Sequence, residues 1–373
     1  MPSAGRPATG STGRPGVPSS PPAGGPSRPT PGTMRAPSSP SRARTRELTQ
    51  AVRMGSKTSL RPPKLEPGQR VALVAPAGPL LERDDLQRGV ELCRALGYEP
   101  VLGRHADRHE GYLAGTDRER LDDLNAALRD PAVAAVWCLR GGYGMTRILD
   151  GVDFAALAAR PKAVIGFSDV TALLNAIVAR AGVVAFHGPM ARSQLTPFSR
   201  FHFDRVLTLP GAAGRLGRVA PPADVLVPEA ARIVPLIPGV ADGPLVGGNC
   251  TLVQCLVGTP YLPDLDGALL VLEDVDEDLY RVDRMLSHFR LAGVLRRLAG
   301  VVVGRFTGMR RGGGDGATGF DRVLLSYLEP LGIPVALGFP VGHVDDQWTL
   351  PLGVRARLDA TAGELELLEP AVR

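Results

Sequence analysis

Ser168 has the sequence surroundings of a nucleophile. It follows a short apolar run at residues 163–165 and a glycine, and it precedes a segment with helical spacing, so the sequence predicts a strand that bends sharply into a helix at the serine. A side chain at such a bend projects from the sheet, and the free N–H groups of the helix start favour a developing negative charge. This resembles a nucleophile elbow, although Val170 replaces the second glycine of Gly-x-Ser-x-Gly. The alternative is that Ser168 only caps the helix.

Two histidines are candidates for the base that such a serine needs. His343 lies in a turn rich in glycine and proline, at residues 337–342, which makes it a candidate general base. His187 ends the apolar stretch 183–186 and is either a second candidate base or a hydrogen-bonded structural group.

Carboxylates gather in one place, after the apolar run at residues 268–272. The sequence there is Glu273-Asp274-Val275-Asp276-Glu277-Asp278, which indicates either a metal site or one functional carboxylate among solvated neighbours. Because the spacing lacks the fixed glycine of a calcium loop, we expect no metal. We also expect no cofactor.

A glycine-rich loop, Arg140-Gly141-Gly142-Tyr143-Gly144, follows the apolar stretch at residues 132–139. In open α/β sheets the loops at the carboxyl ends of strands bind the ligand, and glycines let backbone N–H groups point at a bound oxygen. A simple tight turn is the alternative, but Ser168 sits on the loop after the next predicted strand.

These residues require a framework, and the order of elements predicts a parallel sheet with helices on both faces. Apolar strands are expected at residues 71–75, 99–102, 132–139, 163–166 and 183–186. The first helix carries Leu86, Val90 and Cys93 on one face and ends at Gly97. Thr116 and Glu119 form a capping box for a second helix, which ends before Pro131. The second half of the chain indicates mixed strand and helix without clean parallel alternation.

Length and composition set the outline. A chain of 373 residues with 44% hydrophobic and 22% charged residues is typical of a globular protein of about two domains. Residues 1–60 are rich in Pro, Ser, Gly and Arg and predict a disordered, low-complexity basic tail. This tail holds nine Lys/Arg and one Glu, about +8, so the rest of a chain of net charge +5 carries about −3. The tail is either a weak contact to nucleic acid or anionic lipid, or a solvated extension or misassigned start upstream of Met34 or Met54.

No apolar segment has the pattern of a signal peptide or a membrane span, so we expect a cytoplasmic protein. The four cysteines form no Cys-x-x-Cys pair and predict core residues rather than a zinc site or disulfides.

Seven motifs follow one another in one order within residues 65–365. They are Val74-Ala75-Pro76-Ala77-Gly78-Pro79, Arg140-Gly141-Gly142-Tyr143-Gly144, Gly166-Phe167-Ser168-Asp169, His187-Gly188-Pro189, Gly247-Gly248-Asn249, Leu272-Glu273-Asp274 and Gly342-His343. This ordered set resembles the LD-carboxypeptidase family of serine peptidases, which includes the murein tetrapeptide LD-carboxypeptidases and the microcin-C immunity hydrolases.

The resemblance implies roles for individual residues. Ser168 is then the nucleophile, His343 the base and Glu273 the third member of a triad. The backbone N–H of Asp169 and that of Gly141 or Gly142 would form the oxyanion hole, with Arg140, Tyr143 and Asn249 contacting substrate. Candidates for binding the substrate's terminal carboxylate are Arg140, Arg192 and Arg281.

The resemblance also implies an architecture and a substrate. It implies an amidotransferase-like α/β domain at residues 65–195, an interdomain connection at 196–235 and a β-rich, swivelling β/α domain at 236–373 that supplies Glu273 and His343. The implied protein is a homodimer that releases terminal D-alanine from murein tetrapeptides in cell-wall recycling, without nucleic acid or membrane partners. Two alternatives stay open: the same triad acting on a peptidyl-nucleotide or other amide, which an aromatic-lined pocket would favour, and a catalytically idle binding module.

Overall fold

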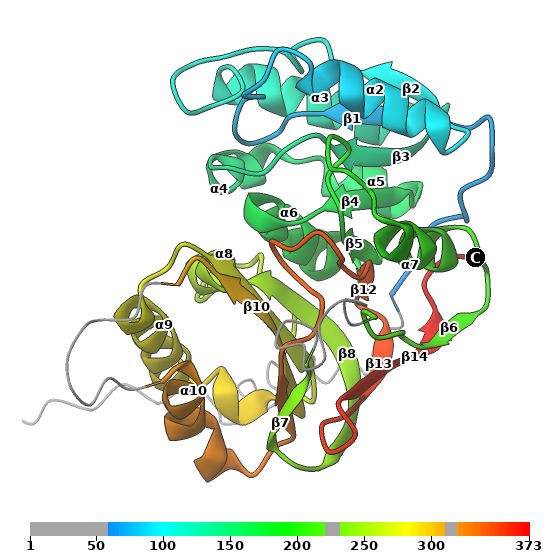
Figure 1. Cartoon of the computed structure of the whole chain (residues 1–373). Coiled ribbons are helices and arrows are strands. Elements are labelled where there is room, and N and C mark those ends of the chain that lie inside the picture. The colour runs from blue at the N-terminus through cyan, green and yellow to red at the C-terminus, as the bar shows by residue number, and fades with distance from the viewer. Residues whose placement is uncertain (1–58, 221–231, 310–318) are drawn as a thin grey trace, which may run out of the picture. The chain divides into compact units, whose positions relative to one another are not determined.

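Two β-sheets with helices packed on them make up the described part of the chain in the computed structural model (Figure 1). The structure describes residues 59–220, 232–309 and 319–373, so the tail predicted at residues 1–60 lies outside it except for its last two residues. The described residues belong to a single compact unit. The predicted α/β fold with a parallel-rich N-terminal sheet and a second sheet is confirmed.

The first sheet has the strand order β12-β5-β4-β3-β1-β2. Its five parallel strands are β1 (Arg70–Val74), β2 (Glu99–Leu102), β3 (Val133–Cys138), β4 (Ala163–Gly166) and β5 (Ala185–His187). A sixth, β12 (Leu350–Leu352), comes from the far end of the chain and pairs antiparallel with β5. The inner strands are apolar except for Arg70 at the start of β1 and His187 at the end of β5, because helices cover both faces of the sheet.

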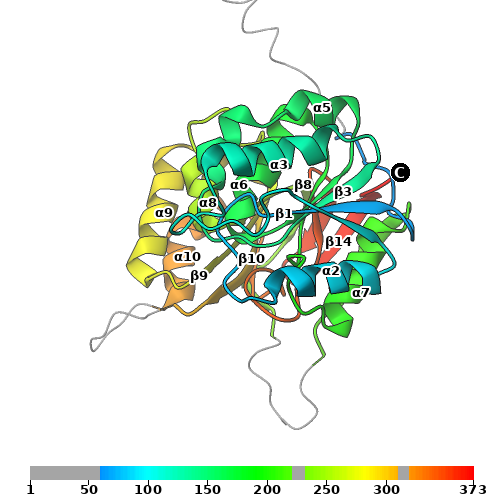
Figure 2. The same ribbon diagram turned by 90° about the horizontal axis from the view of Figure 1, so that it is seen from above.

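Five helices provide this cover. They are α2 (Asp85–Ala95), α3 (Asp117–Arg129), α5 (Phe154–Ala159), α6 (Thr171–Ala176) and α7 (Pro197–Leu207). Figure 2 shows α2 and α7 on one side of the strands and α3, α5 and α6 on the other. Shorter turns of helix are α4 (Met145–Ile148), the 3₁₀ turns Leu149–Gly151, Ser168–Val170, Leu295–Arg297 and Glu329–Leu331, and the π-helical turn Ile177–Ala181.

Local signals in the sequence predicted the first two long helices well. Helix α2 buries Val90 and Cys93 and is followed by Gly97 at φ 88°, a left-handed position that suits glycine. Helix α3 begins with the predicted capping box, in which Thr116 Oγ1 accepts from the Glu119 N–H and Glu119 accepts from the Thr116 N–H. Both predictions are confirmed.

The second sheet has eight strands in the order β6-β14-β13-β8-β9-β10-β11-β7. They are β6 (Ala212–Arg215), β7 (Val234–Ile237), β8 (Val240–Asn249), β9 (Leu269–Val275), β10 (Gly300–Thr307), β11 (Val335–Leu337), β13 (Arg355–Asp359) and β14 (Glu364–Pro370). Strands β8, β9, β10 and β11 run parallel to one another, and the other pairs are antiparallel.

The expectation of no clean parallel alternation in the second half is therefore wrong. Helices α8 (Cys250–Leu256), α9 (Leu279–Leu291) and α10 (Phe320–Leu328) each connect two successive parallel strands, as in the first sheet. The pattern escaped sequence analysis because β8 contains three glycines and a proline, residues that weaken the signal of a strand interior.

The segment predicted as an interdomain connection, residues 196–235, contains α7 and β6 and extends to the first residues of β7; residues 221–231 lie outside the description. Each half of the chain also returns to the other: β12 joins the first sheet, and the Lys64 N–H donates to the Arg373 carbonyl (3.0 Å). The two-domain division at residues 65–195 and 236–373 stays a prediction.

Side-chain distribution follows from this packing. Cys93, Cys138 and Cys250 are buried, as expected of core residues, whereas Cys255 is exposed, so that part of the expectation is wrong; all four are free thiols.

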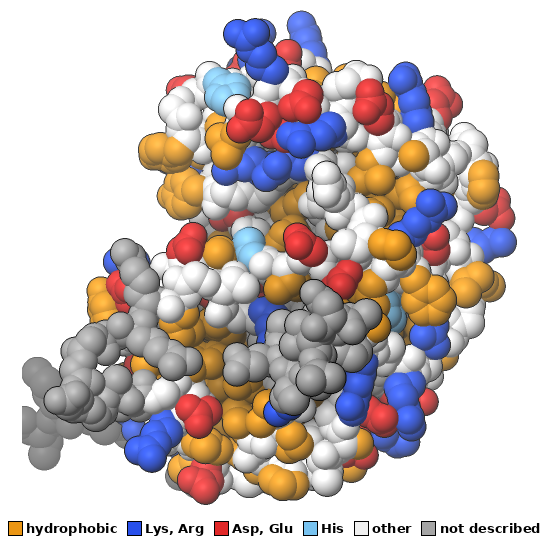
Figure 3. Space-filling view, in the orientation of Figure 1, with side chains coloured by type: hydrophobic (Ala, Val, Ile, Leu, Met, Phe, Trp, Pro, Cys, Tyr) orange, Lys and Arg blue, Asp and Glu red, His pale blue; other side chains and the backbone are white. Residues whose placement is uncertain are grey.

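Acidic and basic side chains are mixed over the face seen in Figure 3. Within the described residues, no helix is both long and apolar enough to span a membrane.

Candidate active site

Ser168 occupies the sharp bend between β4 and α6 that the sequence predicted. Its backbone φ is 57°, a left-handed value that only one other non-glycine residue in the described ranges adopts. A conformation of this kind costs about 1–3 kcal/mol and typically persists where function requires it. Neither the 3₁₀ turn that starts at Ser168 nor α6 has a side-chain cap, so the alternative that Ser168 merely caps the helix is wrong.

The missing second glycine of the elbow pattern has a structural explanation. A Cβ on Gly166 would lie 2.9 Å from Cγ1 of Val170, so the glycine two residues before the serine provides the space that Val170 occupies. The close approach between strand and helix is thus retained with one glycine instead of two.

Ser168, His343 and Glu273 form one hydrogen-bonded chain. His343 Nε2 lies 3.1 Å from Ser168 Oγ, and His343 Nδ1 lies 2.9 Å from Glu273 Oε2. Because an ionised carboxylate only accepts, the Nδ1–H donates to Glu273 and leaves the Nε2 lone pair to accept the serine hydroxyl. The structure therefore brings together a hydroxyl, an imidazole and a carboxylate that the sequence separates widely.

The surroundings of Glu273 and His343 hold this geometry. Glu273 lies in β9 and is fully buried; burial raises its pKa, and its hydrogen bond to His343 opposes that rise. Gly342, at φ 112°, precedes the histidine, and a Cβ there would lie 2.6 Å from Glu273 Oε2. Glycine at this position lets the loop between β11 and β12 approach the carboxylate. The Phe167 ring packs edge-on against His343, with centroids 4.9 Å apart.

The glycine-rich loop after β3 lies directly against the serine. A Cβ on Gly141 would be 3.0 Å from Ser168 Oγ and 3.3 Å from the Asp169 nitrogen. The Gly141 carbonyl accepts from the Gly78 N–H (2.8 Å), so the loops after β1 and β3 are joined behind the site. Asp169 is buried and accepts from the Met145 N–H (2.8 Å), which fixes the end of the same glycine-rich loop.

His187, the second candidate base, forms no hydrogen bond with Ser168. It is fully buried in β5, neither ring nitrogen has a partner among the described residues, and burial followed by the charge of His343 lowers its pKa to about 3. It is therefore a neutral group packed behind the site.

Three further residues were predicted to contact substrate. Arg140 donates to the Pro79 carbonyl (2.6 Å), and Tyr143 is 49% exposed and packs edge-on against Tyr112. Asn249 is buried and caps α8: its oxygen accepts from the Leu252 N–H (3.2 Å) and its amide nitrogen donates to Asp274 (2.8 Å). Both ends of the Asn249 amide thus bind protein groups, and none of these three residues lines the cavity beside His343.

That cavity has a volume of about 430 Å³. His343 and Phe167 line it together with polar and charged residues, namely Arg88, Arg192, Ser193, Gln194, Asp345 and Gln347. Sequence analysis proposed Arg192 as one of three candidates but missed Arg88 and Phe167. The signal for Arg88 is its position one turn after Asp85 at the start of a helix that follows the first strand's loop.

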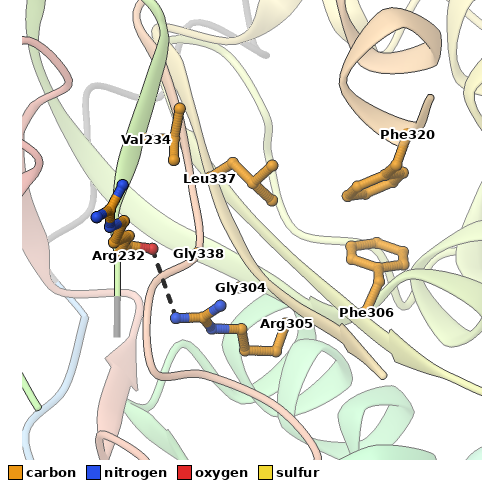
Figure 4. Close-up of a pocket in the computed structure, with 8 residues that line it drawn as sticks. All are labelled: Arg232, Val234, Gly304, Arg305, Phe306, Phe320, Leu337 and Gly338. Atoms are coloured by element: carbon orange, nitrogen blue, oxygen red, sulfur yellow. Dashed lines mark hydrogen bonds between the residues drawn. The ribbon is translucent and has the colours of Figure 1, made fainter. Parts of the chain in front are cut away.

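A second cavity, of about 290 Å³, lies at the start of the loop between β11 and β12, the loop that carries His343 (Figure 4). The rings of Phe306 and Phe320 contact each other there, with centroids 4.7 Å apart and their planes tilted by 45°, and Arg305 also lines the cavity. The backbone N–H of Arg305 donates to the carbonyl of Val341 (2.9 Å), which is two residues before His343. Within the described ranges, no group of three or more His, Cys, Asp or Glu residues is arranged to hold a metal ion.

Comparison with known proteins identifies the family of this chain. Residues 71–188 match the LD-carboxypeptidase N-terminal domain and residues 242–358 match the LD-carboxypeptidase C-terminal domain. A putative carboxypeptidase of Streptomyces coelicolor is 40% identical over 326 residues, which cover 84% of this chain and 97% of that protein. The murein tetrapeptide carboxypeptidase of Pseudomonas aeruginosa is 36% identical over 297 residues, covering 78% and 93% of the two chains.

Solved structures agree with the sequence comparison. The muramoyltetrapeptide carboxypeptidase of Oxalobacter formigenes superimposes with a TM-score of 0.68 at 34% identity, covering 80% of this chain and 98% of that one. The microcin C7 self-immunity protein superimposes with a TM-score of 0.76 at 24% identity, covering 84% and 100%, and this likeness shows the fold.

The fold and these relatives define an enzyme of the serine carboxypeptidase class. The chain belongs to the LD-carboxypeptidase family.

Proposed function

We propose that the protein hydrolyses the L,D-amide bond between the diamino acid and the terminal D-alanine of murein tetrapeptides, with Ser168 as nucleophile. The observation that carries this proposal is the hydrogen-bonded chain from Ser168 through His343 to Glu273. The substrate is taken from relatives named for murein tetrapeptide and muramoyltetrapeptide.

The chain of hydrogen bonds specifies the proton transfers. His343 Nε2 takes the proton of Ser168 as its oxygen attacks the scissile carbonyl, and the imidazolium then gives that proton to the leaving D-alanine nitrogen. Glu273 keeps the ring oriented with Nε2 toward the serine and stabilises the imidazolium. Water, activated by His343, then releases the acyl group.

The oxyanion of each tetrahedral intermediate needs two donors near Ser168. The Asp169 N–H is one, because it starts the turn next to the nucleophile. For the other we propose the Gly142 N–H: the Gly141 carbonyl points at the Gly78 N–H, and in a trans peptide the following N–H points the opposite way. Removing such a donor typically costs about 2.7–4 kcal/mol of transition-state stabilisation.

The setting of the reaction follows from the substrate. We propose a cytoplasmic enzyme of peptidoglycan recycling that acts as a homodimer on a small peptide. Four free thiols, three of them buried, support a reducing compartment. Sedimentation of the purified protein checks the dimer.

The test is release of D-alanine from a murein tetrapeptide by the purified protein. We expect turnover and covalent labelling by a fluorophosphonate probe, both lost in Ser168→Ala. Ser326→Ala is the matched control and should keep full activity, because among the described residues this hydroxyl hydrogen-bonds only the Val323 carbonyl, within α10. Labelling without D-alanine release would refute the substrate, and turnover by Ser168→Ala would refute the nucleophile.

One observation favours the alternative of a peptidyl-nucleotide or other amide substrate. The contacting rings of Phe306 and Phe320 provide an aromatic cavity beside the loop that carries His343 (Figure 4). The two tryptophans do not contribute: Trp137 and Trp348 are buried and donate to the carbonyls of Pro189 (2.7 Å) and Gly217 (2.8 Å). If Phe320→Ala lowers hydrolysis of a peptidyl-nucleotide but leaves tetrapeptide hydrolysis unchanged, this alternative is supported. Absence of both probe labelling and turnover would leave the idle binding module.

A further inference from the structure

Two arginines of the cavity beside His343 share one buried carboxylate. Asp85, at the first position of α2, is completely buried. Its Oδ1 accepts from Arg88 Nη2 (2.7 Å) and from Arg192 Nη1 (3.4 Å). Its Oδ2 accepts from the backbone N–H groups of Leu81 (3.0 Å) and Glu82 (3.1 Å). Asp85 is therefore held rigidly and fixes both guanidinium groups.

The electrostatics of this cluster keep Asp85 ionised between the two guanidinium groups. Burial raises the pKa of Asp85, but its two backbone hydrogen bonds and the two arginines outweigh burial and hold the pKa below its usual value. A third guanidinium, Arg140, is close enough that Arg192, after burial, lowers its pKa. The acidic neighbours are Asp84, 3.4 Å from Arg88, and Asp345, an exposed cavity residue.

Both arginines also keep hydrogen-bonding capacity. Nε of Arg88 and Nε of Arg192 are buried and have no partner among the described residues, and a guanidinium has five N–H groups in all. The two side chains are 42% and 33% exposed, so outer N–H groups of both guanidinium groups stay open to a ligand in the cavity. Guanidinium groups pair with carboxylates through two parallel hydrogen bonds.

The position of the pair relative to His343 identifies which carboxylate fits. In the proposed reaction His343 delivers a proton to the leaving nitrogen, so the cavity that it lines is on the leaving-group side of the bond. In a C-terminal amino acid the carboxylate carbon lies about 2.5 Å from that nitrogen. An internal residue presents a neutral amide at the same place.

We infer that Arg88 and Arg192, positioned by Asp85, bind the C-terminal carboxylate of the substrate and so restrict the enzyme to the last peptide bond. This inference rests on the proposed hydrolase function. Arg88 and Arg192 thus select substrates with a free C-terminus and take no part in breaking the bond.

The experiment compares a tetrapeptide ending in free D-alanine with the same peptide ending in D-alanine amide. For the wild type, kcat/KM for the free acid should exceed that for the amide by 100-fold or more. Arg192→Gln and Arg88→Gln should each lower kcat/KM for the acid by 10- to 100-fold, mainly through KM, and leave the amide within twofold. Arg192→Lys, which keeps the charge but not the paired donors, should fall between.

The matched control is Arg357→Gln in β13, an exposed arginine that donates to both carboxylate oxygens of Asp242 at 2.8 Å. This variant should leave kcat/KM unchanged for both the acid and the amide. Fluorophosphonate labelling of Ser168 reports folding and must proceed at the wild-type rate in each variant. Equal wild-type hydrolysis of acid and amide, or equal loss of both in the variants, would overturn the inference while the hydrolase stands. Labelling without hydrolysis of either peptide would overturn the proposed substrate and this inference together.

Discussion

At the scale of single residues, Gly141 faces Ser168 with no room for a side chain. In Gly141→Ala the new Cβ would lie 2.9 Å from Ser168 Cβ, 3.0 Å from its Oγ and 3.3 Å from the Asp169 backbone nitrogen. We expect kcat to fall at least 100-fold because the hydroxyl or the oxyanion donors must shift. Steady-state kinetics and fluorophosphonate labelling measure this.

Gly211→Ala is the control for that substitution, because a Cβ on this exposed glycine meets nothing within 4 Å. Its activity should equal that of the wild type. Unchanged kcat in Gly141→Ala would show that the glycine-rich loop does not form part of the oxyanion site.

The sequence identified some site residues by chemistry and others only by resemblance. Ser168 and His343 stood out because a bend and a turn leave their side chains available. Glu273 did not, since five residues after it include four further carboxylates and only the fold shows which one is buried against a histidine. Arg88 had no signal beyond its spacing from Asp85, because Arg192, the second arginine on that carboxylate, is about a hundred residues away in the sequence.

At the scale of elements, the capping box of α3 gives a clean prediction about stability. Thr116→Ala removes the acceptor for the Glu119 N–H (3.2 Å), and we expect the free energy of unfolding to fall by about 1 kcal/mol. Thr116→Ser keeps the hydroxyl and should restore most of it. Denaturant unfolding measures both, and kcat should stay within twofold, because the cap does not contact the site. Equal stability of all three proteins would contradict the prediction.

Helix α3 matters for the site through one buried side chain. Arg120 donates to the carbonyls of Pro76 (2.6 Å) and Gly144 (3.0 Å), which belong to the loops after β1 and β3. The cap itself could be predicted because its signal spans four residues. The tie made by Arg120 could not, since a surface helix rich in charged residues gives no indication of which charge is buried.

At the scale of the whole molecule, a buried histidine makes stability depend on pH. Burial, with Arg205, lowers the pKa of His202 to about 4 from an ordinary 6.5. The folded state therefore binds fewer protons than the unfolded state between these values, and stability from this group is lost as pH falls from 6.5 toward 4.

The test is His202→Phe, which keeps an aromatic ring among Phe198, Phe201 and Trp348. Relative to wild type, the variant should gain roughly 1 kcal/mol per pH unit between pH 6.5 and 4.5. Above pH 7.5 the difference should be constant. Parallel stability curves across the whole range would show that His202 titrates normally in the folded protein.

The overall arrangement was the hardest level to predict. The parallel strands of the first sheet follow from local apolar runs that alternate with helices. The addition of β12 to that sheet depends on a pairing between residues 350–352 and 185–187, for which three apolar residues in a proline-containing segment give no local signal. Such long-range pairings come from packing of the whole chain.

The strand β12 has a consequence for how the gene can be divided. In a fragment that ends after α7, β5 would be an unpaired edge strand, because β12, which pairs with it, is encoded some 160 codons downstream. Unpaired edge strands promote self-association. The complementary fragment would carry an apolar tripeptide with no sheet to join. Recombination that exchanges one half for that of a homologue must therefore keep the pairing of β12 with β5.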